Sequence, residues 1–202
     1  FGAGNQKVFT SRVRHAQALS DKFAYKLAFE HSQGEEFDYV DSVYVANKAY
    51  SELDLDRDFA STKFNTQFNY KTGGLGELVA YYGHSNSNNI AVTSAGRNQI
   101  KDWKIDELQL KYIHPRFFLN AYQQWSNTDD TYAMNQRTQN YVSFKNAGFS
   151  EEEARRRSFD EQWFGASPTA GLALKRGSRF KDDSKRFVAE GQYNNSWGAF
   201  TM

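Results

Sequence analysis

The feature that most constrains this chain is the strict alternation of apolar and polar side chains over short segments. In residues 23–32 the large apolar side chains occupy every second position: Phe23, Tyr25, Leu27 and Phe29. Because successive side chains of a β-strand point to opposite faces, this spacing places all four on one face. The segment is therefore predicted to be a strand with one apolar and one polar face.

The same alternation recurs along the chain and predicts roughly seven strands, each about ten residues long. The predicted strands are 8–17, 23–32, 59–70, 77–84, 105–114, 117–126 and 186–195. Tight polar turns fall near 18–22, 71–76, 114–116 and 195–199, and long polar excursions at 34–57, 85–104 and 127–184. Every second connection is thus short, the arrangement that outer-membrane barrels have, with tight turns at one end and long loops at the other. Strands of about ten residues also fit a tilted crossing of a bilayer.

Composition excludes several classes of protein and of site. The chain holds 12 Tyr and 17 Phe residues, yet its mean hydropathy is −0.79. No run approaches the roughly 18 apolar residues that a membrane helix requires, whereas alternating strands need no such run. The chain contains no cysteine, which excludes disulfides and thiolate metal sites, and a net charge of +1 with scattered basic residues does not indicate a nucleic-acid partner.

The longest excursion contains one helix signal. Ser150 is followed by three glutamates, which together form a capping box with acids at the positive end of the helix dipole. We therefore predict a short helix from Ser150 to about Gln162, in a long loop.

The sequence offers no recognisable catalytic constellation. Its histidines, His15, His31, His84 and His114, lack metal-ligand spacing, and no G-x-S-x-G motif is present. We predict no catalytic residue, no metal site and no cofactor, and hence not an enzyme. The acidic stretch 34–41, with Asp54, Asp56 and Asp58 beyond it, leaves a loop Ca²⁺ site open, but a solvated surface loop is favoured.

Several short phrases resemble the barrel of TonB-dependent outer-membrane receptors, in the subgroup with an extra N-terminal carboxypeptidase-regulatory-like domain. They are HPRFFLNAYQQWSNT at 114–128, GRNQI at 96–100, RTQNY at 137–141 and FVAEGQYN at 187–194. The resemblance spans nearly the whole chain. It implies an all-β antiparallel meander belonging to a transmembrane barrel of about 22 strands, filled by a plug domain and powered through a TonB box.

The chain departs from that family pattern in the number of its strands and in lacking a plug and a TonB box. About seven strands cannot close such a barrel, and an open edge in lipid would leave backbone groups unpaired. We therefore expect residues 1–202 to be a partial barrel domain, with the plug and the remaining strands outside it. Its first and last strands should not pair with each other.

The resemblance implies an active-transport receptor in the bacterial outer membrane. Its external loops would bind a scarce nutrient, and its partners would be outer-membrane lipid, its own plug and remaining strands, the TonB complex and a surface lipoprotein. The ligand-binding candidates in the loops are Tyr39, Tyr44, Arg97, Trp103, Tyr132 and Arg137. The candidates that face the lumen or the plug are Arg12, Arg14, Lys26, Glu30, Lys63 and Glu190. The alternative is a secreted or surface all-β carbohydrate-binding module.

Overall fold

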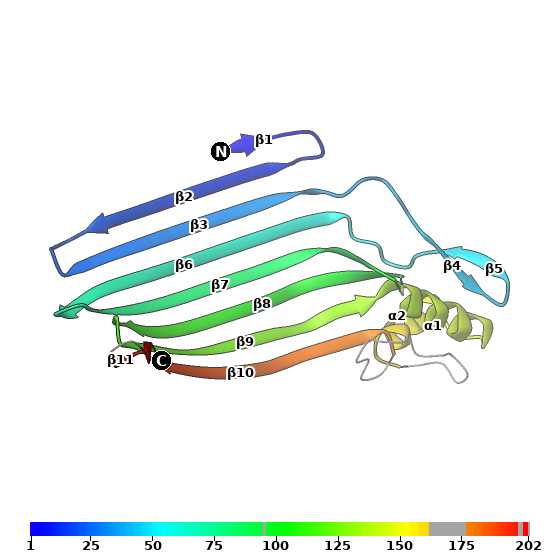
Figure 1. Ribbon diagram of the computed structural model, residues 1–202. Helices are drawn as coiled ribbons and strands as arrows, with labels where there is room; N and C mark the ends of the chain where they lie inside the picture. Colours follow the sequence, from blue (N-terminus) through cyan, green and yellow to red (C-terminus); the bar gives the residue numbers. More distant parts are fainter. Residues whose placement is uncertain (95, 162–176, 198–199, 202) are drawn as a thin grey trace.

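The computed structural model describes residues 1–94, 96–161, 177–197 and 200–201. Its main element is one antiparallel sheet with the strand order β1-β2-β3-β6-β7-β8-β9-β10 (Figure 1). The strands are β1 (Gly2–Ala3), β2 (Phe9–Ala18), β3 (Phe23–Glu35), β6 (Asp58–Gly73), β7 (Gly76–Thr93), β8 (Gly96–Ile113), β9 (Phe117–Ala133) and β10 (Arg179–Tyr193). Neighbours in the sheet follow one another along the chain, apart from the β4–β5 insertion between β3 and β6, so the sheet is a simple meander.

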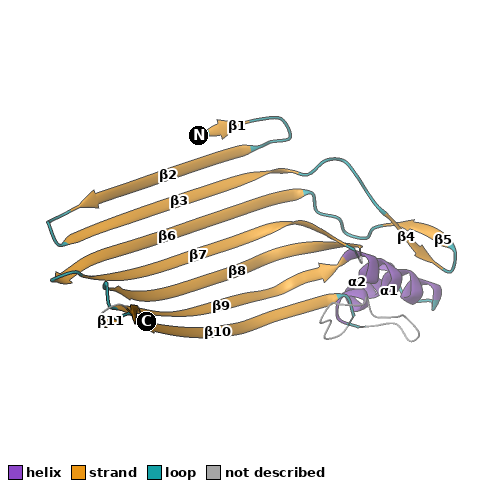
Figure 2. Cartoon of the chain, viewed as in Figure 1, coloured by secondary structure: helices purple, strands orange, loops and turns teal. Residues whose placement is uncertain are grey.

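The insertions lie together at one end of the sheet, where β7 also ends and β8 begins, and the tight turns after β2, β6 and β8 lie at the other end (Figure 2). A hairpin of β4 (Ser42–Val45) and β5 (Lys48–Ser51) connects β3 to β6. Two helices, α1 (Met134–Asn146) and α2 (Glu151–Asp160), lie between β9 and β10. Beyond β10, β11 (Ser196–Trp197) pairs with β12 (Phe200–Thr201). We call β4, β5, α1, α2 and their connections the loop assembly.

Each of the seven predicted strands is present, but the predicted length of about ten residues is wrong for six of them, because β3 has 13 residues and β6 to β10 have 15 to 18. Two predictions about the connections are also wrong. Residues 85–104 are not a loop, because β7 and β8 continue as a paired ladder that sets Ile90 opposite Gln99 and Val92 opposite Arg97. The long insertion after β9 contains two helices, not one. Helix α1 was missed because its buried side is largely polar, with Gln136 among its buried residues, so the sequence carries no apolar stripe.

Helix α2 confirms the capping prediction. The Ser150 hydroxyl accepts a hydrogen bond from the Glu153 amide at 3.2 Å, and the helix begins at the next residue, Glu151. Arg156 and Arg157 donate to the Glu153 carboxylate and lower its pKa to about 2. The helix ends at Asp160; Gln162, where the predicted helix ended, lies outside the described residues.

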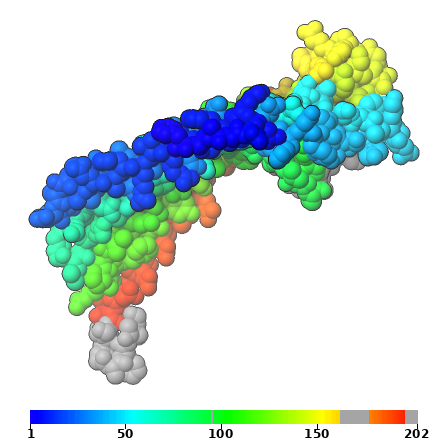
Figure 3. Space-filling model, turned by 90° about the horizontal axis from the view of Figure 1, so that it is seen from above, coloured from blue at the N-terminus to red at the C-terminus, as the bar shows by residue number. Residues whose placement is uncertain are grey.

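The sheet is open over the described residues. As expected from the sequence, β2 does not pair with β10: β2 lies between β1 and β3, and β10 pairs with β9. Seen from above, the sheet is a twisted layer, with β2 (dark blue) along one edge and the end of β10 (red) displaced far from it (Figure 3). No described helix combines the length and the apolarity needed to cross a membrane.

The buried core lies in the loop assembly rather than against the middle of the sheet. The buried apolar side chains are Val43, Leu53, Val79, Ile100, Tyr132, Ala133, Met134, Val142, Phe144 and Ala154. All but Val79 belong to the loop assembly or to the ends of β8 and β9 beside it. The apolar side chains in the middle of the sheet therefore have no protein layer over them within the described residues.

The cap of α2 gives a first test. Replacing Ser150 by Ala removes the acceptor for the Glu153 amide and should cost about 1 kcal/mol. Amide hydrogen exchange in the first turn of α2 should accelerate about fivefold. Ser150→Asp is the matched control, because aspartate also caps helices, and it should retain the protection. Equal exchange in Ser150→Ala and the parent chain would show that the cap contributes nothing.

Candidate functional site

One face of the sheet carries most of the exposed apolar side chains, with polar ones such as His15, Thr66 and Gln123 among them. The register places Leu27, Thr66, Tyr82, Leu108, Gln123 and Phe187 in one row across the strands. The exposed large side chains of this apolar face are Val13, Leu27, Phe29, Phe64, Phe68, Tyr70, Leu108, Leu110, Phe117, Leu119, Phe187 and Tyr193. Leu108 is 53% exposed and Phe187 is 67% exposed. Soluble monomers rarely expose an apolar patch of this extent, which marks this face as a contact surface.

Aromatic side chains border the apolar face at both ends. Toward the tight turns lie Phe23, Tyr70, Tyr112, Phe117 and Tyr193. The row next to Leu27 on the side of the loop assembly carries Phe29, Phe64 and Trp125, together with the polar side chains of His84, Asp106 and Lys185. The rings of Phe117 and Tyr193 are 5.1 Å apart. The next row toward the loop assembly is polar and includes Asn86 and Lys104. The apolar face is therefore a bounded band rather than a surface that runs the full length of the strands.

The opposite face is polar and carries all six candidates predicted to face a lumen. Arg12 pairs in register with Glu30, and Glu30 pairs with Lys63, so the three side chains form a row. Arg12 Nη2 lies 2.6 Å from Glu30 Oε2, and Lys63 Nζ lies 3.8 Å from Glu30 Oε1. The other three candidates lie at even spacings from members of this row: Arg14 is two positions from Arg12, Lys26 is four from Glu30, and Glu190 is six from Ser184 of β10. An even spacing along a strand keeps them on the same face.

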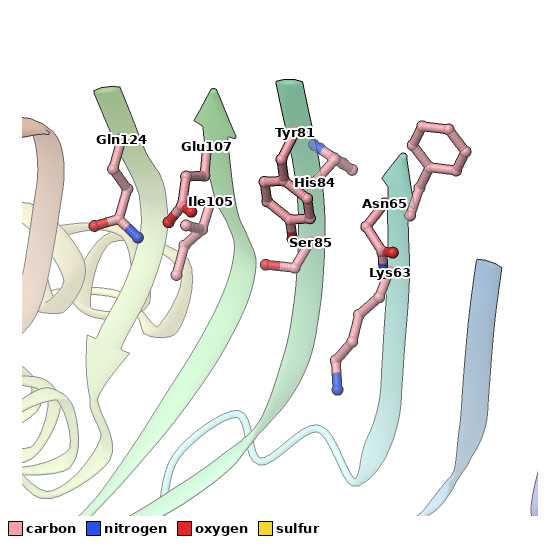
Figure 4. Close-up of a pocket in the computed structure, with 10 residues that line it drawn as sticks. Lys63, Asn65, Tyr81, His84, Ser85, Ile105, Glu107 and Gln124 are labelled. Atoms are coloured by element: carbon pink, nitrogen blue, oxygen red, sulfur yellow. The ribbon is translucent and has the colours of Figure 1, made fainter. Parts of the chain in front are cut away.

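The polar face is recessed along β6 and β7. One recess of about 210 Å³ includes Lys63, Asn65, Tyr81, Gly83, Ser85, Ile105, Glu107 and Gln124 in its lining (Figure 4). A second recess of about 280 Å³ lies nearer the loop assembly and includes Glu36, Phe59, Ser61, Ser87, Asn88 and Asn89. Both recesses are lined by consecutive stretches of the same two strands.

The loop assembly is held by a buried ion pair. The Arg97 guanidinium, on β8, contacts the Glu52 carboxylate through Nε at 3.1 Å and through Nη2, which also donates to the Tyr39 carbonyl at 3.1 Å. The Arg97 guanidinium also lies 5.1 Å from the centre of the Tyr39 ring. Hydrogen bonding to Glu52 raises the pKa of Arg97. Tyr39 and Arg97 were predicted as ligand-binding residues, whereas here they join parts of the loop assembly. Glu52 was not predicted, because it is far from Arg97 in the chain.

A second charged cluster joins the β5–β6 connection to both helices. Asp54 pairs with Arg137 of α1, whose Nη2 lies 2.9 Å away, and with Arg155 of α2. The Arg137 guanidinium lies 4.5 Å from the centre of the Tyr132 ring and 4.7 Å from that of Phe159. The Tyr132 hydroxyl donates to the Asp54 carbonyl at 2.7 Å. Arg137 and Tyr132 therefore hold the assembly together.

The structure brings some of the predicted ligand-binding residues together, but not all of them. Tyr44 and Arg97 line a recess of about 250 Å³ with Asp41, Ser42, Val43, Glu52, Gly96, Asn135 and Gln139. Tyr44 is on β4 and is 67% exposed. Arg97 and Trp103 are strand residues of β8, not loop residues as predicted, since β8 extends to Gly96. The Trp103 indole donates to the Ser126 hydroxyl on the polar face, away from Tyr44.

Four of the seven acidic residues considered for Ca²⁺ pair with basic side chains. Glu35 pairs with Lys7 and Arg57, Asp38 with Arg57, Asp54 with Arg137 and Arg155, and Asp56 with Lys101. In the part of the chain that the structure describes, no three His, Asp or Glu side chains gather where they could hold a metal ion. Comparisons of the chain with protein-family models, with curated proteins and with solved structures gave no significant match.

The buried ion pair gives a second test. Glu52→Ala leaves the Arg97 charge buried without its carboxylate and should destabilise the loop assembly by about 3–5 kcal/mol. The double variant Arg97→Met/Glu52→Leu removes both charges and should cost much less. Lys104→Ala, which removes a half-exposed partner of Asp102, is the control and should cost about 0–1 kcal/mol. Amide exchange in α1 gives the free energy of local opening for each of the three variants. Equal losses of that free energy in Glu52→Ala and Lys104→Ala would contradict the prediction.

The third test uses pH. Burial is the largest influence on the Tyr132 phenol and raises its pKa from 10.0 to about 12. Because the folded pKa is the higher one, the stabilisation is fully present below pH 10 and is lost as the pH rises through about 12. The tyrosinate absorbance of the parent chain minus that of Tyr132→Phe should titrate near pH 12. A difference that titrates near pH 10 would show that Tyr132 is not buried.

Proposed function

We propose that this chain forms part of the wall of an outer-membrane β-barrel of the TonB-dependent receptor type. In this proposal the apolar face contacts lipid, and the polar face lines a lumen that holds a plug. The loop assembly lies outside the cell and binds a scarce nutrient, which is imported when TonB acts on the plug. The protein carries out no bond chemistry.

The observation that carries the proposal is the pair of opposed faces. A soluble sheet has its apolar face against a protein core, whereas here the face that includes Leu108 and Phe187 is exposed and bounded by aromatic side chains at both ends. Transmembrane barrels have this arrangement: an outward apolar band with aromatic girdles and a polar interior. The polar row of Arg12, Glu30 and Lys63 on the other face fits a water-filled or plug-filled interior.

Two further features support the proposal. Both large insertions, β4–β5 and α1–α2, lie at one end of the strands, and the tight turns after β2, β6 and β8 lie at the other, as in outer-membrane barrels; the short connection between β7 and β8 lies at the insertion end. One edge of the sheet is formed by β1 and by the part of β2 that β1 does not pair with, and the other edge is β10. These open edges would be costly in lipid, because backbone groups there have no water to pair with. In the proposed barrel these edges pair with further wall strands.

The alternative, a secreted carbohydrate-binding module, has one argument: the exposed Tyr44 beside a polar recess could stack on a sugar ring. That alternative leaves the apolar face unexplained, because a secreted monomer would expose it to water. We therefore favour the barrel.

The proposal predicts opposite responses at neighbouring positions of β3. Leu27 lies on the apolar face and Ala28 on the polar face. Leu27→Arg should lower the free energy of unfolding in phospholipid vesicles by about 2–4 kcal/mol if the position is near the bilayer midplane, and Ala28→Arg should lower it much less. Denaturant titration of the vesicle-inserted protein, together with membrane fractionation of the cells, measures both.

Equal costs at the two positions would contradict the facing assignment. A chain that stays monomeric in buffer without detergent, and that Leu27→Arg makes more soluble without destabilising it, would instead support the secreted module.

A further inference from the structure

The recesses on the polar face share a pair of strands. The register sets Ser61 beside Ser87, Lys63 beside Ser85 and Asn65 beside Gly83. The two recesses therefore follow each other along β6 and β7, from Asn88 near the loop assembly to Tyr81 in mid-sheet. We call this feature the β6–β7 groove.

Small side chains form the floor of the groove. Its β7 positions on the polar face are Gly83, Ser85 and Ser87, and Ser61 adds a further hydroxyl from β6. In the row that contains Ser85, the strands on the β2 side carry Arg12, Glu30 and Lys63, and β8 carries Ile105. The wall is therefore thinned at Ser85 and Ser87 of β7, and larger side chains lie on either side of them.

The sides and the inner end of the groove are defined by particular side chains. Lys63 lies beside Glu30 on one side, and Glu107 on β8 lies on the other. Tyr81 closes the end in mid-sheet: its hydroxyl would be 2.5 Å from a Cβ on Gly83, so the phenol ring covers this glycine. Figure 4 shows Tyr81, Ser85, Glu107 and Lys63 around the recess.

We propose that the β6–β7 groove is the passage along which a small polar solute moves from the loop assembly into the barrel interior. This inference rests on the proposed function, because only a closed barrel makes the polar face an interior. The lining favours a solute that carries hydroxyl or amide groups, because its own polar groups are mainly hydroxyls and amides; its charged members are Lys63, Glu107 and, in the outer recess, Glu36. The Tyr81 ring narrows the inner end.

Single-cysteine labelling tests the passage, because residues 1–202 contain no cysteine; any cysteine elsewhere in the whole protein is first replaced by serine. A charged, membrane-impermeant methanethiosulfonate reagent is added to intact cells that carry Ser87→Cys, Ser85→Cys, Ser184→Cys or Leu108→Cys in the whole protein. Ser184 lies in the same row as Ser85 but on β10, outside the groove, and Leu108 lies on the apolar face. We expect rapid modification at Ser87 and Ser85, slower modification at Ser184, and none at Leu108.

A second variant tests whether the groove is the route. Ser61→Trp fills the outer recess and should slow modification of Ser85→Cys by about tenfold or more, equivalent to a barrier higher by about 1.4 kcal/mol. Ser61→Thr and Ser184→Trp are the controls and should leave that rate unchanged. If the Trp variant fails to reach the membrane, the comparison of Ser85→Cys with Ser184→Cys still tests the passage.

The outcomes separate the two proposals. Modification of Ser87→Cys without Ser85→Cys would mean that the groove is closed below Ser87, which overturns the passage. So would a rate at Ser85 that Ser61→Trp leaves unchanged, or equal rates at Ser85 and Ser184. Modification of Leu108→Cys as fast as Ser85→Cys would mean that water covers the apolar face, and the proposed barrel itself would be wrong.

Discussion

The cross-strand register of the seven long strands is the constraint on which the rest of this molecule depends. Side chains alternate between faces with a period of two, so a slip of one residue at any strand pair would move a whole row of apolar side chains to the polar face. The register keeps Leu27 in line with Leu108 and Phe187, and Arg12 in line with Glu30 and Lys63. One sheet thereby has two surfaces of opposite character without a second layer.

The loop assembly supplies what the sheet lacks, which is a buried core. Its stability combines ordinary apolar packing around Met134 and Phe144 with buried charge pairs such as Arg97 with Glu52. Charges at such positions are tolerated because each guanidinium has a carboxylate, a carbonyl or an aromatic ring beside it, as Arg137 has between Tyr132 and Phe159. A rigid assembly of this kind fixes the recess near Tyr44, and in the proposed receptor that is where a ligand would first be held.

The two proposals draw on different parts of the same sheet. The proposed barrel wall rests on the apolar face, whereas the proposed passage rests on small residues of β7 on the polar face, around Gly83 and Ser85. In these proposals each strand residue faces either the lipid or the interior, and which one it faces depends on whether it is an even or an odd number of positions from a residue of known facing. This separation allows labelling at Leu108 to test the wall independently of labelling at Ser85.

The sequence alone determined the strands, their facing and the cap of α2, because alternation and capping are local patterns that neighbouring residues impose directly. It could not reveal that β7 and β8 extend through residues 85–104, since that polar ladder is held by pairing between strands. Helix α1 and the partners of Arg97 and Arg137 also emerged only in the tertiary structure. The buried side of α1 is largely polar, and Glu52 and Asp54 reach their arginines across large sequence separations. Such long-range contacts leave no periodic signal in the chain.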